Sequence, residues 1–197
     1  MHAPELSTGA LAALKKEPII FKAFEWIGKN PYSKDTNPQG IINAGIAANK
    51  TITPQLVDKL NSLTKVIDSD LEYNASQGGP ELRGEIAGLF NRHFHPAAPV
   101  NPNDIVVTNG CTTAIEMLAF ATCEPGDRIL IPAPCYAALD GDVGARPQAR
   151  ATMVEMPLDE TMSVSQIKYF ERAIAEIAAR DERAKMLFLM SPHNPLG

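Results

Sequence analysis

Apolar residues recur along the chain at two spacings, one typical of helices and one of buried strands. A spacing of three to four residues predicts one-sided helices over 19–27, 53–63, 80–90, 112–121 and 166–180. Short, continuously apolar runs predict buried strands over 105–107, 128–131, 152–156 and 186–190. Strands and helices alternate from residue 105 onward, which favours an α/β fold with a mainly parallel sheet flanked by helices.

The N-terminal third has a different pattern. Residues 1–18 resemble an arm, and Asn30–Gly40 is a connection rich in Pro, Gly and Asn. We therefore divide the chain into an arm with part of a small domain over 1–70, and a sheet-bearing domain over 71–197.

Composition and charge narrow the class of partner. The chain has 197 residues, of which 45% are hydrophobic and 21% charged, and 18 basic against 23 acidic side chains give a net charge of −5. This balance is typical of a globular protein and gives no electrostatic case for nucleic acid or an acidic membrane surface. Met186–Met190 is too short to span a bilayer, and the start lacks a secretory pattern, so we expect a cytoplasmic protein. A small-molecule ligand becomes the favoured partner.

The three cysteines, Cys111, Cys123 and Cys135, are too far apart for a metal or redox pair. We interpret them as small buried or half-buried residues and expect no metal site.

Ligands of parallel sheets bind beyond the carboxyl ends of the strands, where we expect four turn-rich segments of this chain to fall. Residues 108–114, T-N-G-C-T-T-A, lead from a predicted strand into a helix, so backbone N–H groups and the helix dipole could hold a phosphate. Thr112 or Thr113 could equally be an ordinary helix cap. Residues 132–136, P-A-P-C-Y, place Tyr136 where it could stack on a ring or merely pack.

The third segment is residues 191–197, S-P-H-N-P-L-G, whose prolines stiffen the backbone around Asn194. Its amide could serve a ligand or simply the turn. A fourth segment, Tyr73–Arg83, is a Gly-rich approach to a helix with Pro80 in its first turn, and a plain loop with a cap explains it as well.

In this order, the four segments resemble the class I/II aminotransferases, which are fold-type I enzymes dependent on pyridoxal 5'-phosphate. The matching motifs are Y-x-x-x-Q-G-G-P-E-L-R, T-N-G-C-T-T-A, E-P-G-D-R-I-L-I-P-A-P-C-Y and S-P-H-N-P-L-G. Asn30–Asn49 is most similar to the 1-aminocyclopropane-1-carboxylate synthase branch and its fungal relatives. The resemblance covers Ile20–Gly197 and identifies 71–197 as the first half of the cofactor-binding large domain.

The resemblance also implies roles for particular residues. The backbone N–H groups of Cys111 and Thr112, with the Thr112 hydroxyl, would hold the cofactor phosphate, and Tyr136 would stack on the pyridine ring. Asn194 would donate to the ring hydroxyl oxygen, and Ala47 would lie near the carboxylate of an amino acid substrate. The family further implies a homodimer in the full-length form.

The resemblance assigns no residue of this chain to three later family positions: the aspartate at the pyridine nitrogen, the Schiff-base lysine and the arginine that binds the substrate carboxylate. We therefore name no catalytic residue and expect an N-terminal portion of an aminotransferase-like enzyme. The alternatives are a lyase of carbon–sulfur or aminocyclopropane type, and a non-catalytic truncated paralogue or dimer partner. Ala48 and Ser76 depart from the glutamate and tyrosine of the synthase branch.

Overall fold

The computed structural model describes residues 5–14, 19–63, 65–161 and 163–197, which form two compact units. Residues 30–108 form one unit, and the described residues of 1–29 and 109–197 form the other. The first holds α3 (Thr53–Leu63), η1 (Asp68–Leu71), α4 (Pro80–His93) and η2 (Pro102–Asp104). The second holds α1 (Thr8–Leu14), α2 (Ile19–Lys29), α5 (Gly110–Thr122), β1 (Arg128–Ala133), α6 (Leu139–Gly144), β2 (Arg150–Glu155), η3 (Val164–Gln166), α7 (Ile167–Ala178) and β3 (Ala184–Leu187).

The second unit is built on a parallel three-stranded sheet with the order β2-β1-β3. In the central strand β1, Leu130 aligns with Thr152 of β2 and with Leu187 of β3. Because helices cover both faces of the sheet, β1 is apolar and buried at successive positions rather than at alternate ones. The predicted fold class, an α/β fold with a mainly parallel sheet flanked by helices, is confirmed.

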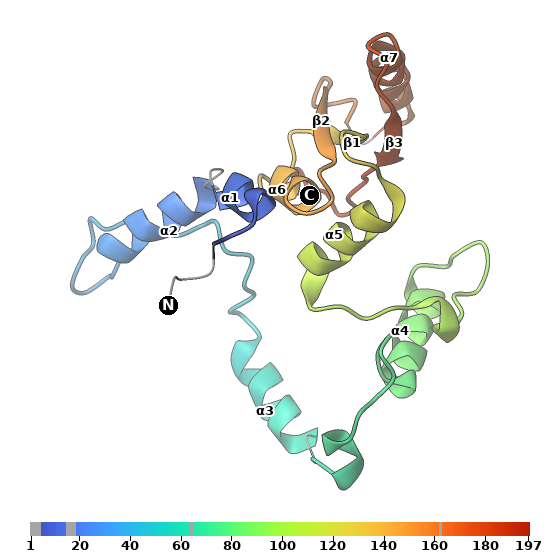
Figure 1. Ribbon diagram of the computed structural model, residues 1–197. Helices are drawn as coiled ribbons and strands as arrows, with labels where there is room; N and C mark the ends of the chain where they lie inside the picture. Colours follow the sequence, from blue (N-terminus) through green and yellow to red (C-terminus); the bar gives the residue numbers. More distant parts are fainter. Residues whose placement is uncertain (1–4, 15–18, 64, 162) are drawn as a thin grey trace. The chain divides into compact units, whose positions relative to one another are not determined.

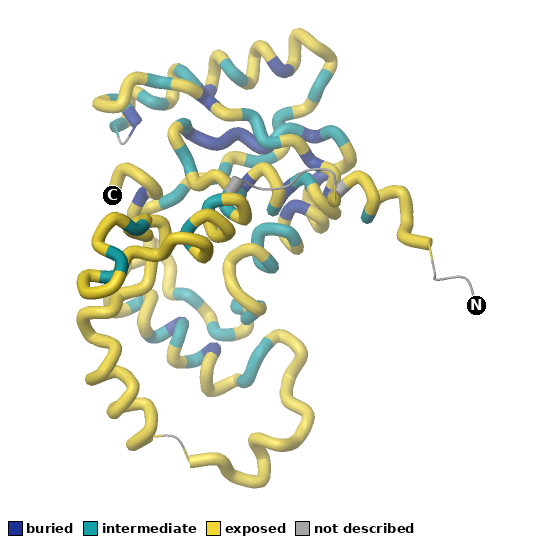
Figure 2. Tube along the Cα trace, turned by 90° about the vertical axis from the view of Figure 1, so that its left-hand side faces the viewer, coloured by how far each residue is buried: buried dark blue, intermediate teal, exposed yellow. Residues whose placement is uncertain are grey.

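Two apolar clusters hold the helices on opposite faces of the sheet (Figure 1). Ile129 and Ile131 point to the face that packs against α5 and α6, whereas Leu130 points to the face that packs against α7. Figure 2 shows this core as the buried stretch along β1. The helix α6, which the sequence pattern did not predict, supplies the fully buried Leu139 and Val143.

Two crossover connections join the parallel strands, and both have the same hand. From β1 to β2 the chain passes through α6, and from β2 to β3 it passes in the opposite direction through α7, on the other face. Reversing both the direction and the face preserves the hand, as expected of parallel crossovers. All three strands therefore end at one edge of the sheet, the carboxyl edge.

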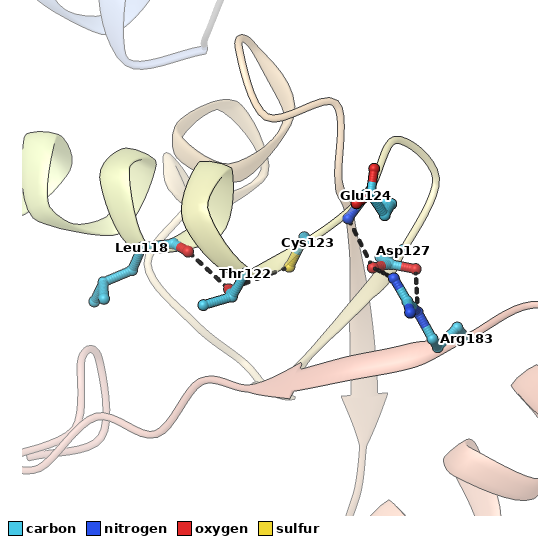
Figure 3. Close-up of polar contacts among 6 residues, drawn as sticks. All are labelled: Leu118, Thr122, Cys123, Glu124, Asp127 and Arg183. Carbon is cyan, nitrogen blue, oxygen red and sulfur yellow. Dashed lines mark hydrogen bonds and ion pairs between the residues drawn. The ribbon is translucent and has the colours of Figure 1, made fainter.

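The opposite, amino edge is fixed by charge pairs (Figure 3). Asp127, just before β1, is 6% exposed and accepts hydrogen bonds from Arg183 at 2.8 and 2.5 Å and from the Glu124 N–H at 2.8 Å. Arg128 pairs with Glu182 in the same region. These bonds join the starts of β1 and β3, so the E-P-G-D-R motif acts here as a structural element.

In the first unit, the Gly-rich segment is held by a buried arginine. Arg83 on α4 is 5% exposed and donates to the carbonyl oxygens of Gly78 at 3.0 Å and Pro102 at 2.7 Å. Gly78 has a φ of +106°, and a Cβ there would lie 2.8 Å from the Val107 side chain, so only glycine suits this position. The segment is therefore an ordered loop that packs on residue 107.

The predicted strand over 105–107 is wrong. These residues are extended but form no strand, and the Val107 N–H donates to the Gln77 carbonyl at 2.8 Å. An apolar run becomes a strand only when it finds a partner for its backbone, and β1, β2 and β3 pair with one another instead.

The remaining elements lie close to their predicted positions. The helices predicted at 19–27, 53–63, 80–90, 112–121 and 166–180 are α2, α3, α4, α5 and α7, and β1, β2 and β3 overlap the runs at 128–131, 152–156 and 186–190. α3 is exposed along its whole length (Figure 2). None of the described helices is both long enough and apolar enough to cross a bilayer. The domain boundary at residue 70 stays a prediction.

Within the predicted arm, α1 forms over Thr8–Leu14, whereas residues 1–4 and 15–18 lie outside the described residues.

Candidate functional site

Three of the predicted site segments gather at the carboxyl edge of the sheet. Tyr136 follows the end of β1, and Asn194 follows the neighbouring strand β3. α5 ends just before the start of β1 and packs along the sheet through Ala119, so its first turn lies toward the carboxyl edge. A bond from Thr112 to α6, the helix that follows β1, agrees with this direction. The topology thus brings Cys111, Thr112, Tyr136 and Asn194 to one edge.

The first turn of α5 offers backbone donors. The helix begins at Gly110, whose φ of +83° suits glycine, and the preceding Asn109 makes no side-chain capping bond with the described residues. By helix geometry, the N–H groups of Cys111 and Thr112 have no carbonyl partner within α5. Neither Thr112 nor Thr113 caps the helix. The Thr112 hydroxyl donates to Asp142, and the Thr113 hydroxyl donates to the Asn109 carbonyl. These donors and the positive end of the helix dipole suit an anion.

The Thr112 hydroxyl is engaged elsewhere. It donates to Oδ2 of Asp142 on α6 at 3.5 Å, a contact that the sequence reasoning missed. Partial burial raises the pKa of the Asp142 carboxyl, and the bond from Thr112 acts in the opposite direction. The backbone N–H groups are therefore the donors that α5 presents, and a phosphate contact from the Thr112 hydroxyl stays a prediction.

The two side-chain candidates are open to ligands. Tyr136 is 38% exposed, and Asn194 is exposed on the segment that follows β3. Beside Tyr136, Sγ of the half-buried Cys135 lies 3.4 Å from Sδ of Met153. Cys123 is buried as expected, but Cys111 is exposed because it lies in the first turn of α5.

A buried histidine, whose role the sequence reasoning did not consider, adjoins Asn194. His193 is 5% exposed, and its Nδ1 accepts the Leu196 N–H at 3.4 Å. Its Nε2 is buried and has no hydrogen-bond partner among the described residues. A lone histidine between two prolines carries no periodic pattern, so its burial could not be predicted from the sequence.

Ala47 belongs to the other unit, 30–108, and is exposed there. Its role near a substrate carboxylate stays a prediction. The second unit by itself thus offers amide donors at a helix start, an aromatic face and a side-chain amide, a set that suits a flat, anionic ligand.

Comparisons with known proteins agree with this chemistry. The sequence model of the family "Aminotransferase class I and II" matches residues 28–197. The chain is 36% identical over 160 residues to a probable aminotransferase, sirI, of Leptosphaeria maculans, which covers 80% of this chain and 38% of that protein. It is 29% identical over 189 residues to the mouse "probable inactive 1-aminocyclopropane-1-carboxylate synthase-like protein 2", with 91% and 32% covered. The chain thus spans about a third of the length of these relatives.

Solved structures show the same fold. The chain superposes on BacF of Bacillus subtilis with a TM-score of 0.66 at 21% identity, which covers 98% of this chain and 45% of that one. The Rhizobium meliloti aspartate aminotransferase gives a TM-score of 0.65 at 18% identity, with 98% and 44% covered. A mutant aspartate aminotransferase of Thermus thermophilus is 26% identical, with a TM-score of 0.55 and 73% and 36% covered.

Proposed function

Because the chain belongs to the class I and II aminotransferase family, we propose that it supplies the phosphate-, ring- and hydroxyl-binding part of a pyridoxal 5'-phosphate site in an enzyme that transaminates an amino acid. The observation that carries this proposal is that the α5 first turn and the segments of Tyr136 and Asn194 all lie toward the carboxyl edge of the sheet. In its full form we expect a cytoplasmic homodimer.

The residues at this edge fit the cofactor. The N–H groups of Cys111 and Thr112 would hold its phosphate, Tyr136 would cover its ring, and the Asn194 amide would donate to its ring oxygen. The fit rests on the missing side-chain cap of α5 and on the exposure of Tyr136 and Asn194. Bound pyridoxal 5'-phosphate supplies an electron sink for reactions at the α-carbon of an amino acid.

We assign each of these residues a binding or orienting task. The backbone donors of α5 place the phosphate against the helix dipole. Tyr136 keeps one ring face away from water, and Asn194 favours the deprotonated ring oxygen by donating to it. Asp142 places a carboxyl group beside this anion site, where it accepts a hydrogen bond from the Thr112 hydroxyl.

Removing the side chain of Asn194 or Tyr136 should weaken the binding of the cofactor. We expect Asn194→Ala to lower the affinity for pyridoxal 5'-phosphate about tenfold, since a hydrogen bond to a charged oxygen is lost. Tyr136→Ala should lower it about fivefold through lost stacking. Cys111→Ala should change the affinity by less than about twofold, because alanine keeps the backbone N–H. Equilibrium dialysis of the full chain measures all three.

Asn61→Ala, an exposed position on α3, is the matched control and should bind as the wild type does. Equal affinity of Asn194→Ala and wild type, or loss of cofactor by Cys111→Ala, would show that these positions are wrongly assigned. A wild-type chain that does not bind the cofactor would overturn the proposal itself.

Two other functions are compatible with the same family and with the same set of cofactor-binding residues. One is a lyase of carbon–sulfur or aminocyclopropane type, and the other is a non-catalytic paralogue or dimer partner. Both alternatives are supported by relatives named as 1-aminocyclopropane-1-carboxylate synthase-like proteins, one of which carries the word "inactive" in its name.

The non-catalytic alternative depends on whether a lysine of this chain reacts with the cofactor. Lys168 on α7 forms an ion pair with Glu160 at 2.7 Å, and the hydrogen bond that its amine donates to the Glu160 carboxylate raises the pKa of that amine. A protonated amine is a poor nucleophile. After incubation with pyridoxal 5'-phosphate and borohydride, mass spectrometry should find no single lysine labelled in full. Complete labelling of Lys168 or Lys185 would contradict this expectation.

A further inference from the structure

His193 is the buried residue of the segment 191–197, whose other residues are exposed. A histidine that is 5% exposed has given up most of its contact with water, so its polar atoms need other partners. The contacts among the described residues show which hydrogen-bond partners the polar atoms of His193 have.

Both polar contacts of His193 close the turn that carries Asn194. Its Nδ1 accepts the Leu196 N–H at 3.4 Å, and its carbonyl oxygen accepts the Gly197 N–H at 2.7 Å. Each bond spans Asn194 from one side to the other. The backbone of Asn194 is therefore held between His193 and the two residues whose N–H groups donate to it, one to the ring and one to the backbone carbonyl.

The hydrogen-bonding state of the ring follows from these contacts. An Nδ1 that accepts a hydrogen bond must keep its lone pair, so this contact requires the ring proton to lie on Nε2. Nε2 is buried and has no partner among the described residues. Within the described part of the chain, the polar contacts of the ring thus serve its own turn.

We propose that His193 is a positioning residue: its buried ring, through Nδ1, holds the turn 193–197 so that the Asn194 amide is fixed for the cofactor. The inference rests on the proposed function, because it needs Asn194 to bind pyridoxal 5'-phosphate. The His193 ring needs no contact with the ligand, because Asn194, its neighbour along the chain, makes that contact.

Two conservative substitutions separate the two ring nitrogens. Asparagine can place an acceptor oxygen where Nδ1 lies, whereas glutamine places its amide near Nε2. We expect His193→Asn to retain the affinity for pyridoxal 5'-phosphate within about twofold. His193→Ala and His193→Gln should each weaken it about tenfold, the effect of a lost hydrogen bond to the turn. His93→Ala, an exposed histidine at the end of α4, is the control and should have no effect.

A double-mutant cycle tests whether His193 acts through Asn194. With Asn194→Ala already present, the His193 substitutions should change the affinity by less than about twofold, because no amide remains to be positioned. Equilibrium dialysis with pyridoxal 5'-phosphate measures each variant, and circular dichroism confirms its folding. Long-range ¹H–¹⁵N spectra of the wild type should show the Nε2–H tautomer.

The proposal is overturned if glutamine preserves affinity and asparagine does not, if the His193 and Asn194 effects add in full, or if the Nδ1–H tautomer is found. If all three His193 variants fail to fold, the ring is a core element only, and the proposal is again wrong. If Asn194→Ala binds as the wild type does, the assignment of Asn194 fails and the inference with it. If Asn194→Ala weakens binding and His193→Ala does not, the inference alone fails.

Discussion

Replacing Ile131 with alanine should destabilise the protein by about 3 to 4 kcal/mol, the usual cost of removing a large aliphatic side chain from a close-packed core. Ile131 is fully buried at the centre of β1 and packs in the cluster shared with α5 and α6. Neighbours in a sheet with both faces covered cannot collapse into the space left behind. Urea unfolding followed by circular dichroism measures the change.

The control is Ile42→Ala, at a position 72% exposed, which should change the stability by less than about 0.5 kcal/mol. If the two variants lose equal stability, β1 is not at the core. Because α5 and α6 pack on the same cluster, Ile131→Ala should also loosen the packing of these helices on the sheet.

Replacing Arg183 with methionine should destabilise the protein near neutral pH. The substitution leaves the carboxylate of Asp127 buried with a single backbone donor, and breaking one side of a buried pair is costly. Arg183 itself is half exposed, so we place the effect below that of a fully buried pair. The change should raise the pKa of Asp127, which the Arg183 guanidinium now holds below its usual range.

The pH dependence follows from the sign of that shift. A carboxyl whose pKa is lower in the folded state stabilises the fold above its unfolded pKa, and this contribution is lost as the pH falls through its folded pKa. The stability difference between the wild type and Arg183→Met should therefore be constant near neutral pH and shrink below about pH 4. Urea titrations across this range test it.

Arg172→Met is the matched control, because Arg172 pairs with Glu176 on the exposed face of α7. Such pairs contribute at most about 0.5 kcal/mol. An Arg172 effect as large as that of Arg183, or a difference that does not change below about pH 4, would mean that Asp127 is not the group responsible.

The sequence predicted the helices and strands of the second unit well, because each one buries apolar residues at its own period. Ile167, Phe170, Ile174 and Ile177 mark α7 at intervals of three and four, and Ile129–Ile131 marks a strand covered on both faces. α6 was missed because its six residues include two glycines and complete fewer than two helical turns. The run over 105–107 was read as a strand because an apolar run does not show whether a partner exists.

Some features of the candidate site were likewise predictable from the sequence, and others were not. Motif order identified Cys111, Thr112, Tyr136 and Asn194 as candidates. The segments of Tyr136 and Asn194 lie at one edge because parallel strands end together, whereas Cys111 and Thr112 lie there because of how α5 packs on the sheet. Only the tertiary structure decided that the Thr112 hydroxyl bonds to Asp142, thirty positions away in sequence, and that His193 is buried. Local patterns determine which elements form, since periodicity is a property of neighbouring residues. Contacts between distant side chains depend on how those elements pack, and no local pattern encodes that.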